Sequence, residues 1–394
     1  MKFNTYSISE LIDEIAMGPF GSNIKVECFV DDGIPVLNGS NLNGFFLTED
    51  SFRYVTEEKA DSLGRANAHR GDIVITHRGT LGQIVCIPET SKYDRYVISQ
   101  SQFRVKCNEK VLPEYLVYYF HTAIGQHKLL SNASQVGVPA LARASTTFQK
   151  IEVEIPDIKT QQKVVSVLNA IEAKINVNHS INENLLQQAQ ALYKNRFVDL
   201  KPFDGEMPPD WRLGTVSEII ELHDSKRIPL SSRERANLAK IYPYYGATSV
   251  MDYVDRYLFD GIYLLLGEDG TVVDSKGFPI LQYVEGKFWV NNHAHIITGK
   301  NGFTVETLYL LFSLTNVQSI VTGAVQPKIS QANLNKVSVV IPSEAELSAF
   351  NSIVQPIFAQ IRNLRAENDR LAATRDTLLP RLMSGKLDVS SLDI

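Results

Sequence analysis

The sequence predicts an α+β protein in which two similar globular domains are separated by two long helices that pair as an antiparallel coiled coil, with an approximate two-fold axis. Two observations predict this arrangement. The run "IEVEIPDIKTQQKVVSVL" at Ile151 has a counterpart 186 residues further along, "VSVVIPSEAELSAFNSIV" at Val337. Each run leads into apolar residues at heptad spacing, which is the pattern of a two-stranded helical seam. The chain therefore contains a duplicated domain followed each time by a duplicated helix.

The duplication extends upstream of these runs. The first domain opens with "SISELIDEI" and the second with "TVSEIIEL", and their Ser-Glu pairs lie 208 residues apart. In both copies a strand-like run ends in a Gly-Thr turn, "GDIVITHRGTLG" at Gly71 and "DGIYLLLGEDGTV" at Asp260. Further on, "YLVYYF" at Tyr115 matches "YLLFSL" at Tyr309. The second copy is shorter by about 22 residues, as expected when loops vary in length.

The long helices are expected to begin just after the two Ile-Pro pairs. Asp157 and Ser343 are good N-cap residues, and Glu346 lies at capping-box spacing from Ser343. Pro356 is expected to kink the second helix without ending it. The alternative to helix pairing is that each helix packs only on its own domain.

The expected seam alternates by four and three residues and carries asparagine at equivalent positions. A buried seam asparagine lowers stability but fixes register and partner. In the first helix the seam comprises Ile171, Ile175, Asn178, Asn182, Leu185, Ala189 and Leu192. In the second helix it comprises Ile357, Ile361, Leu364, Asn368, Leu371, Arg375 and Leu378.

The length of the first helix suggests what the arrangement could measure. A helix from about Thr160 to Arg196 would run ~55 Å, which matches roughly 16 base pairs of duplex DNA. A two-fold object with two domains more than one helical turn apart fits a bipartite DNA site. We expect a first domain at 1–157, a first spacer helix at 158–200, a second domain at 201–342, and a second helix with a tail at 343–394.

Composition restricts the class of protein. The 394 residues carry a formal net charge of −5, so any basic surface for nucleic acid must be local or supplied partly by a partner. No apolar run reaches the ~20 residues of a membrane span, and the N-terminus lacks the apolar core of a signal peptide. The three cysteines lack metal-ligand spacing and are expected to be reduced thiols of a cytoplasmic protein.

Several stretches in this order resemble the specificity (S) subunit of Type I restriction–modification enzymes, and the resemblance covers nearly the whole chain. The stretches are "GPFGSNIK" at Gly18, "GDIVITHRGTLG" at Gly71, "IPDIKTQQKVVSVLNAI" at Ile155, "ALYKNRFVDLKPFDGEMPPDW" at Ala191, "YYGATSVMDYVDRYLFDGIYLLLGEDGT" at Tyr244, "GKFWVNNHAHII" at Gly286, "TGAVQPKISQANL" at Thr322 and "LLPRLMSGKLDV" at Leu378.

The resemblance implies that each domain is a target recognition domain, a mixed sheet with helices, that reads one half of a split double-stranded DNA sequence. It implies that the coiled coil sets the unspecified spacer and docks two methyltransferase (M) subunits, through which restriction/translocase (R) subunits join. The chain would be non-catalytic and would bind no cofactor itself. S-adenosylmethionine, ATP and magnesium would be used by the partner subunits.

The candidates for DNA contact are polar residues with hydrogen-bonding forks in turns or near strand ends, since such groups bind base edges and phosphates. In the first domain they are Ser22, Asn23, Lys25, Asn38, Ser40, Asn41, His77, Arg78, Thr80, Arg143, Ser145 and Thr146. In the second domain they are Tyr245, Thr248, Ser249, Asp269, Thr271, Asn291, Asn292, His293, Gln326, Lys328 and Ser330, with Glu268 beside them. The two carboxylates are the weakest candidates, because phosphate repels a carboxylate that does not read a cytosine amino group.

Signals for catalysis are weak. The chain has no Walker phosphate loop and no Asn/Asp-Pro-Pro-Tyr/Phe motif of an amino-methyltransferase. Asp274, Glu285 and Lys287 follow a nuclease-like order without a counterpart in the first copy, and His293 and His295 would share one face of a strand. No metal site is expected. The competing hypotheses are a specificity component of a methylation-only or other phage-defence complex, a metal-dependent nuclease, and a coiled-coil scaffold without a DNA role.

Overall fold

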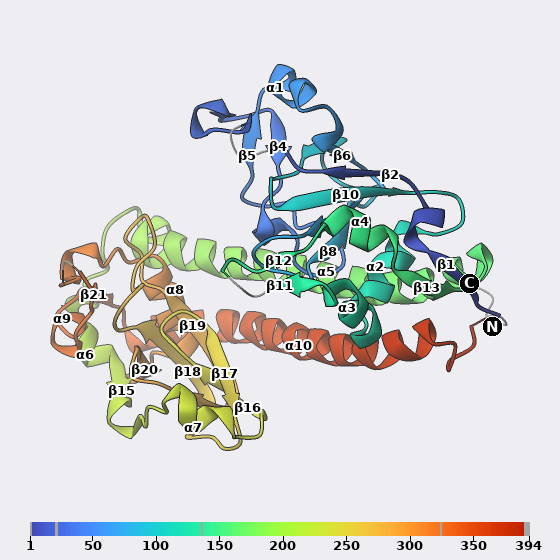
Figure 1. The fold of residues 1–394 in the computed structure, drawn as a ribbon. Coiled ribbons are helices and arrows are strands. Elements are labelled where there is room, and N and C mark those ends of the chain that lie inside the picture. The colour runs from blue at the N-terminus through green and yellow to red at the C-terminus, as the bar shows by residue number, and fades with distance from the viewer. Residues whose placement is uncertain (1, 20–22, 135–136, 324, 390–394) are drawn as a thin grey trace. The chain divides into compact units, whose positions relative to one another are not determined.

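The computed structural model describes residues 2–19, 23–134, 137–323 and 325–389 (Figure 1). The chain forms two compact units: unit 1 comprises Met1–Asn176 and Asn368–Ile394, and unit 2 comprises Val177–Glu367. The units divide the chain differently from the four expected segments, because helices α5 (Ile158–Tyr193) and α10 (Glu344–Met383) each contribute one half to each unit.

Unit 1 is built from antiparallel strand pairs with one parallel pair and short helices (Figure 1). Two small sheets pair β1 (Asn4–Ser7) with β13 (Glu152–Ile155), and β11 (Ala133–Ser134) with β12 (Ala140–Leu141). A four-stranded sheet has the order β2 (Ile12–Met17), β10 (Gln102–Cys107), β7 (Ile73–Thr76), β8 (Ile84–Cys86). A five-stranded sheet has the order β3 (Phe29–Val30), β5 (Arg53–Val55), β4 (Ile34–Val36), β9 (Arg95–Val97), β6 (Asn67–His69). The helices are α1 (Glu57–Ser62), α2 (Pro113–His121), α3 (Ala123–Leu130) and α4 (Ala144–Gln149).

Unit 2 repeats this plan with fewer, longer strands. One pair joins β14 (Arg212–Thr215) to β21 (Ser338–Ile341). The main sheet has the order β15 (Ile220–Leu222), β20 (Ala294–Gly299), β18 (Phe259–Gly267), β19 (Leu281–Val290), β16 (Tyr242–Tyr245), β17 (Val250–Val254). The helices are α6 (Val216–Ile219), α7 (Ser232–Ala236), α8 (Val305–Ser313) and α9 (Gln331–Leu334). The parallel contact of β16 with β19 corresponds to that of β4 with β9 in unit 1.

The register of the first strand pair confirms the duplication. Asn4 lies opposite Ile155 in unit 1, and Arg212 lies opposite Ile341 in unit 2. The first strands of the two pairs start 208 residues apart and their partner strands end 186 residues apart, which are the two offsets of the sequence repeat. The glutamate of each Ser-Glu pair closes a capping box with the residue three positions earlier: Glu10 accepts from Ser7 N at 2.8 Å and Glu218 accepts from Thr215 N at 2.8 Å. The predicted α+β class is confirmed.

The core of each unit forms between its sheet and one apolar helix. The "YLVYYF" run lies in α2, where all six residues are buried, and the matching run lies in α8. No helix among the described residues is long and apolar enough to cross a bilayer, and Cys28, Cys86 and Cys107 are free thiols.

Within each unit the two long helices pair antiparallel. In unit 1, Arg375 forms an ion pair with Glu172 at 2.7 Å, and Asn368 Nδ2 donates to Ile175 O at 3.3 Å. Residue numbers therefore rise along α5 while they fall along α10. Unit 2 shows the same sense, because Asn178 pairs with Glu367 at 3.0 Å, and further along α5 Arg196 pairs with Glu346.

The expected seam positions mostly face inward. Six are buried, namely Ile175, Asn178, Ala189, Ile361, Leu364 and Asn368. Seven are half-buried, namely Ile171, Asn182, Leu185, Ile357, Leu371, Arg375 and Leu378. The prediction for Leu192 is wrong, because Leu192 is 41% exposed whereas its neighbour Tyr193 is 7% exposed and packs on Phe197 and Phe350.

The misplacement of Leu192 follows from helix geometry. A straight helix drifts ~20° per heptad from a strict 3.5-residue repeat. After three heptads from Ile171 the drift amounts to about 60°, so the next residue lies closer to the original face. Helix α10 continues through Pro356, which confirms that this proline does not end the helix, whereas the expected kink stays a prediction.

Candidate nucleic-acid interface

The turn after β7 in unit 1 holds three of the predicted DNA-contact residues, His77, Arg78 and Thr80. Backbone hydrogen bonds fix this turn: His77 N donates to Ser101 O at 2.8 Å, and Leu141 N donates to His77 O at 2.9 Å. Arg78 and Thr80 are exposed, so the turn presents them to solvent.

The turn after β18 in unit 2 has the same backbone scaffold. Glu268 N donates to His293 O at 2.8 Å, and Ile329 N donates to Glu268 O at 2.9 Å. A third bond also repeats, since Gly79 N donates to Pro139 O at 2.8 Å and Gly270 N donates to Pro327 O at 2.9 Å. Both glycines have positive φ, +92° and +84°, a conformation that other residues rarely adopt. The two turns are therefore structural equivalents.

The side chains on the two turns differ in charge. The first turn carries His77 and Arg78 where the second carries Glu268 and Asp269. The facing strand also differs, because Arg78 bridges to Ala140 whereas Asp269 bridges to Lys328. A common scaffold with different side chains lets two modules make different hydrogen bonds from the same position.

Beside the first turn lies a groove of about 550 Å³ that Asn23, His77, Arg78, Arg65 and Gln100 help to line. The groove brings together three predicted contact residues. Burial lowers the pKa of His77, whose Nε2 lies 3.1 Å from Gln100 O. The His77 ring is therefore neutral at pH 7, and Arg78 supplies positive charge, whereas Arg65 pairs with Glu14 at 2.8 Å. Sequence reasoning missed Arg65, because no motif distinguishes it from other surface arginines.

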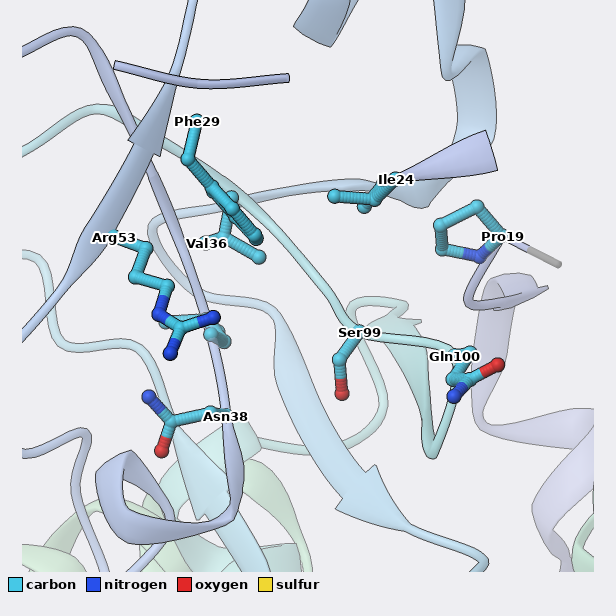
Figure 2. Close-up of a pocket in the computed structure, with 9 residues that line it drawn as sticks. Pro19, Ile24, Phe29, Val36, Asn38, Arg53, Ser99 and Gln100 are labelled. Atoms are coloured by element: carbon cyan, nitrogen blue, oxygen red, sulfur yellow. The ribbon is translucent and has the colours of Figure 1, made fainter. Parts of the chain in front are cut away.

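A second pocket of unit 1, of about 340 Å³, has an apolar wall and a polar rim (Figure 2). Phe29 lies on the wall, and the Arg53 guanidinium lies 5.2 Å from its ring centroid. Asn38, Ser99 and Gln100 complete the rim. Of these residues only Asn38 was predicted, and its Oδ1 already accepts from Ser40 N at 2.8 Å in a helix cap.

The prediction for Asn41 is wrong. Asn41 is 0% exposed, and its amide donates to Thr48 O at 3.0 Å and to Asp50 O at 2.9 Å. Its Oδ1 accepts from Asn38 N at 3.0 Å. The side chain therefore holds a loop from inside and does not reach DNA.

The remaining candidates of unit 1 lie at its surface or outside the described residues. Ser22 lies outside the described residues, whereas Lys25 is exposed. Arg143 is exposed in a left-handed conformation, with φ 48°, directly before α4. Ser145 and Thr146 lie in the first turn of α4, half-buried and exposed respectively.

In unit 2 the prediction for Asn291 is wrong. Asn291 is 4% exposed, its Oδ1 accepts from His293 N at 2.7 Å, and its amide faces Met251 Sδ at 3.2 Å. The exposed candidates are Thr248, Ser249, Thr271, Asn292, Gln326 and Lys328. Tyr245 is half-buried against the ring of Phe288.

Both acidic candidates of the second turn have cationic partners. Glu268 pairs with Arg227 at 2.5 Å and with Lys328 at 3.1 Å. Burial acts to raise the pKa of Glu268, but the hydrogen bond from Arg227 and the charges nearby lower it overall. Asp269 pairs with His293. These pairings reduce the repulsion between the turn and phosphate.

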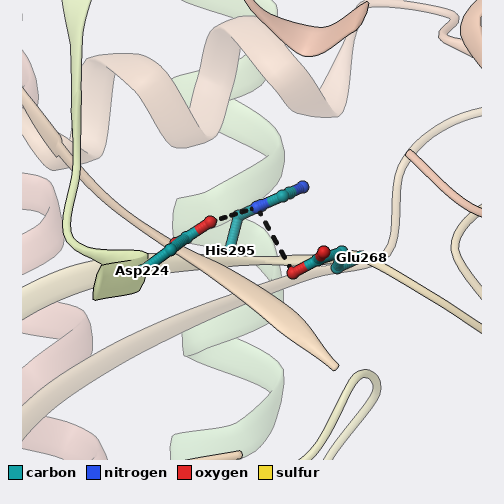
Figure 3. Close-up of side chains that lie close together, drawn as sticks. All are labelled: Asp224, Glu268 and His295. Carbon is teal, nitrogen blue, oxygen red and sulfur yellow. Dashed lines mark hydrogen bonds and ion pairs between the residues drawn. The ribbon is translucent and has the colours of Figure 1, made fainter. Parts of the chain in front are cut away.

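The two histidines of the H-x-H motif do not share an environment. His293 precedes β20 and its side chain is 41% exposed, whereas His295 lies in β20 with a side chain that is 0% exposed. His295 lies beside Asp224 and Glu268 (Figure 3). The expectation that both histidines point to one face is wrong, because the strand begins only after His293.

The nuclease-like order of Asp274 and Glu285 does not form a site. The Asp274 carboxylate accepts from Lys276 N at 2.8 Å and from Phe278 N at 2.9 Å, which closes its own turn. Glu285 pairs with Arg362 of α10 at 3.5 Å. Among the described residues, the grouping of metal-ligand side chains, Asp224 with Glu268 and His295, contains neither of them.

The fold and the paired turns define a class: a duplicated α+β protein that carries two equivalent surfaces of different chemistry. The chain belongs to the family described as the Type I restriction modification DNA specificity domain, which matches residues 19–187 and 208–372. It is a DNA specificity subunit of a type I restriction–modification system, a non-catalytic component of such complexes.

The similarity to individual relatives spans nearly the whole chain. The chain is 24% identical to the MjaIX type I restriction enzyme specificity subunit of Methanocaldococcus jannaschii, with 97% of this chain and 93% of the relative covered. It is 22% identical to the HindI specificity subunit of Haemophilus influenzae, with 75% and 82% covered. The crystal structure of a type I S subunit from M. genitalium matches the fold with a TM-score of 0.57 at 15% identity, with 97% and 96% covered.

Proposed function

We propose that each unit reads one half of a bipartite DNA target, through the turn at His77–Thr80 in unit 1 and the turn at Glu268–Thr271 in unit 2. The single observation that carries this proposal is the repetition of the three backbone hydrogen bonds around turns with different side chains. A shared scaffold gives both turns the same approach to a duplex, and different side chains select different base edges.

The charge of each surface supports this role. Although the formal net charge is −5, Arg65, Arg78 and Arg143 are exposed on unit 1. On unit 2, Lys328 is exposed beside the second turn. Phosphate contacts by such residues position a protein on DNA without reading sequence. Further basic surface would come from the partner subunits.

The paired helices are proposed to set the spacer and to dock two methyltransferase subunits, through which restriction/translocase subunits join. Helix α5 has 36 residues, so it runs for ~54 Å, or about 16 base pairs. The chain is proposed to bind no cofactor, and the partner subunits would bind and use S-adenosylmethionine, ATP and magnesium.

Domain exchange tests the reading of half-sites. Residues 1–157 are replaced by the corresponding segment of a relative with a different target, and methylated adenines are mapped across the host genome. One half of the target should change while the other half and the spacer stay the same. A change in both halves would refute the assignment of one half to each unit.

A matched insertion tests the spacer. One heptad is inserted after Glu183 and another after Gln360, which the Asn178–Glu367 and Arg196–Glu346 pairs place opposite it, so that the antiparallel partners stay in register. Seven residues add ~10 Å of helix, or about 3 base pairs. The mapped target should keep both halves and gain a spacer of that length. An altered base preference with an unchanged spacer would count against this role of the helices.

A further inference from the structure

The buried histidine of unit 2 makes two hydrogen bonds that require two donors. His295 Nδ1 lies 2.6 Å from Asp224 Oδ2, and His295 Nε2 lies 2.8 Å from Ile329 O. One partner is a carboxylate and the other a backbone carbonyl, and both oxygens are acceptors. A neutral imidazole has a single N–H, so it would leave one nitrogen lone pair facing an oxygen. Beside an ionised Asp224, only the doubly protonated ring satisfies both contacts.

The carboxylate partner is held in its ionised form. Asp224 Oδ1 accepts from Ile296 N at 2.8 Å, and Oδ2 accepts from Gln331 Nε2 at 2.5 Å. Burial acts to raise the pKa of Asp224, but its bond with His295 and the bonds from Ile296 and Gln331 lower it overall. Asp224 therefore remains an acceptor at neutral pH.

Besides His295, the charged groups of this cluster are two carboxylates and two cations. Glu268 Oε2 lies 3.7 Å from His295 Nδ1, Arg227 lies 3.5 Å from Asp224 and 2.5 Å from Glu268, and Lys328 lies 3.1 Å from Glu268. The imidazolium brings the cluster to three positive and two negative groups. Because Arg227 already lies on both carboxylates and Gln331 on Asp224, a metal ion at this cluster would have to displace them.

The contacts of His295 reach the segment that carries predicted DNA-contact residues. Ile329 lies between Lys328 and Ser330, and its carbonyl is the acceptor for His295. We propose that His295 is a positioning residue that ties residues 325–330 to the sheet of unit 2 through the contacts of its two ring nitrogens with Asp224 and Ile329. This inference rests on the proposed function, in which unit 2 reads DNA.

The first copy supplies a natural comparison. Phe103 occupies the position in β10 that corresponds to His295 in β20, and it is 0% exposed beside Phe148. An apolar ring therefore fits this place in the fold. The His295→Phe variant should therefore fold, although it lacks both hydrogen bonds. An effect of this variant on DNA binding would then reflect lost positioning of the segment and not loss of the fold.

The binding test uses the full chain assembled with its methyltransferase subunits. Affinity is measured for two duplexes, one with the mapped target and one with the half-site of unit 2 altered. His295→Phe should reduce the preference for the correct half-site on the order of tenfold at pH 7. The control His179→Gln, at an exposed histidine of α5, should leave this preference unchanged.

A spectroscopic readout is independent of DNA. In ¹⁵N spectra of the ring nitrogens, assigned by comparison with His295→Phe, both nitrogens of His295 should be protonated at pH 7. A neutral ring would overturn the inference. So would stabilisation by zinc that EDTA reverses in the native chain but not in His295→Phe, because it would show a metal site.

Lys328→Ala distinguishes failure of this inference from failure of the proposed function. If Lys328→Ala weakens binding and His295→Phe does not, the positioning role is overturned while unit 2 still contacts DNA. If neither change affects binding to the correct target, the role of this segment in reading DNA is overturned as well.

Discussion

Removal of Arg375 should destabilise unit 1 by leaving a carboxylate without its partner between the paired helices. The Arg375 and Glu172 side chains are 19% and 12% exposed, and their charged atoms lie 2.7 Å apart. Breaking a fully buried pair costs about 3–5 kcal/mol. Because both groups retain some exposure and Asp376 also contacts Arg375, we expect Arg375→Met to cost about 2–3 kcal/mol.

Urea unfolding followed by circular dichroism measures this cost. With a denaturant slope of roughly 2 kcal/mol/M, the midpoint of the unit 1 transition should fall by about 1–1.5 M. Adding Glu172→Gln to Arg375→Met should recover part of the loss, because the uncompensated charge is removed. The control is Arg95→Met, which breaks the more exposed pair with Asp61 in the same unit and should cost less than about 1 kcal/mol. Equal costs for Arg375→Met and the control would refute the account of the helix pairing.

Three further changes test other parts of the fold. Replacement of Asn182 and Asn368 by leucine should raise the unfolding midpoint but permit wrong oligomers, and an unchanged profile in size-exclusion chromatography would argue that neither residue lies in the seam. Burial holds the pKa of His121 below its ordinary value, so as the pH falls the unfolded chain binds this proton before the folded chain does, and the free energy of unfolding decreases below about pH 6.5. His121→Gln should make the urea midpoint depend less on pH between about pH 5 and 7. The same pH dependence in the native protein and the variant would contradict the buried, neutral state of His121. Asn41→Ala should cost about 2 kcal/mol by urea unfolding, because the carbonyls of Thr48 and Asp50 lose the donor that the buried Asn41 side chain supplies. Ser40→Ala should cost less than about 0.5 kcal/mol, and equal costs would contradict the interior role of Asn41.

The duplicated architecture could be predicted because its signals are periodic and repeated. The heptads of the two helices recur at a fixed offset, and the glutamates of the Ser-Glu pairs at the start of each domain close capping boxes with Ser7 and Thr215. Such local patterns depend on residues within one or two turns. The prediction for Leu192 was wrong because a fixed seven-residue repeat ignores the drift of a straight helix.

The roles of single polar residues could not be predicted in the same way. Asn41 and Asn291 stand in polar loops, as a DNA-contact residue would, yet both side chains bond inward. The sequence does not show which backbone carbonyl will face an amide several residues away. Likewise, the contacts of His295 are made with Asp224 and Ile329, which are far from it along the chain.

The central claim, that the two equivalent turns contact separate halves of one target, can be tested by site-specific photo-cross-linking. A photoreactive amino acid replaces Thr80 or Thr271, both of which are exposed, in the complex bound to its mapped duplex. The derivative at Thr80 should cross-link to bases of one half-site, and the derivative at Thr271 should cross-link to bases of the other. Cross-links from both positions to the same half-site would contradict the claim.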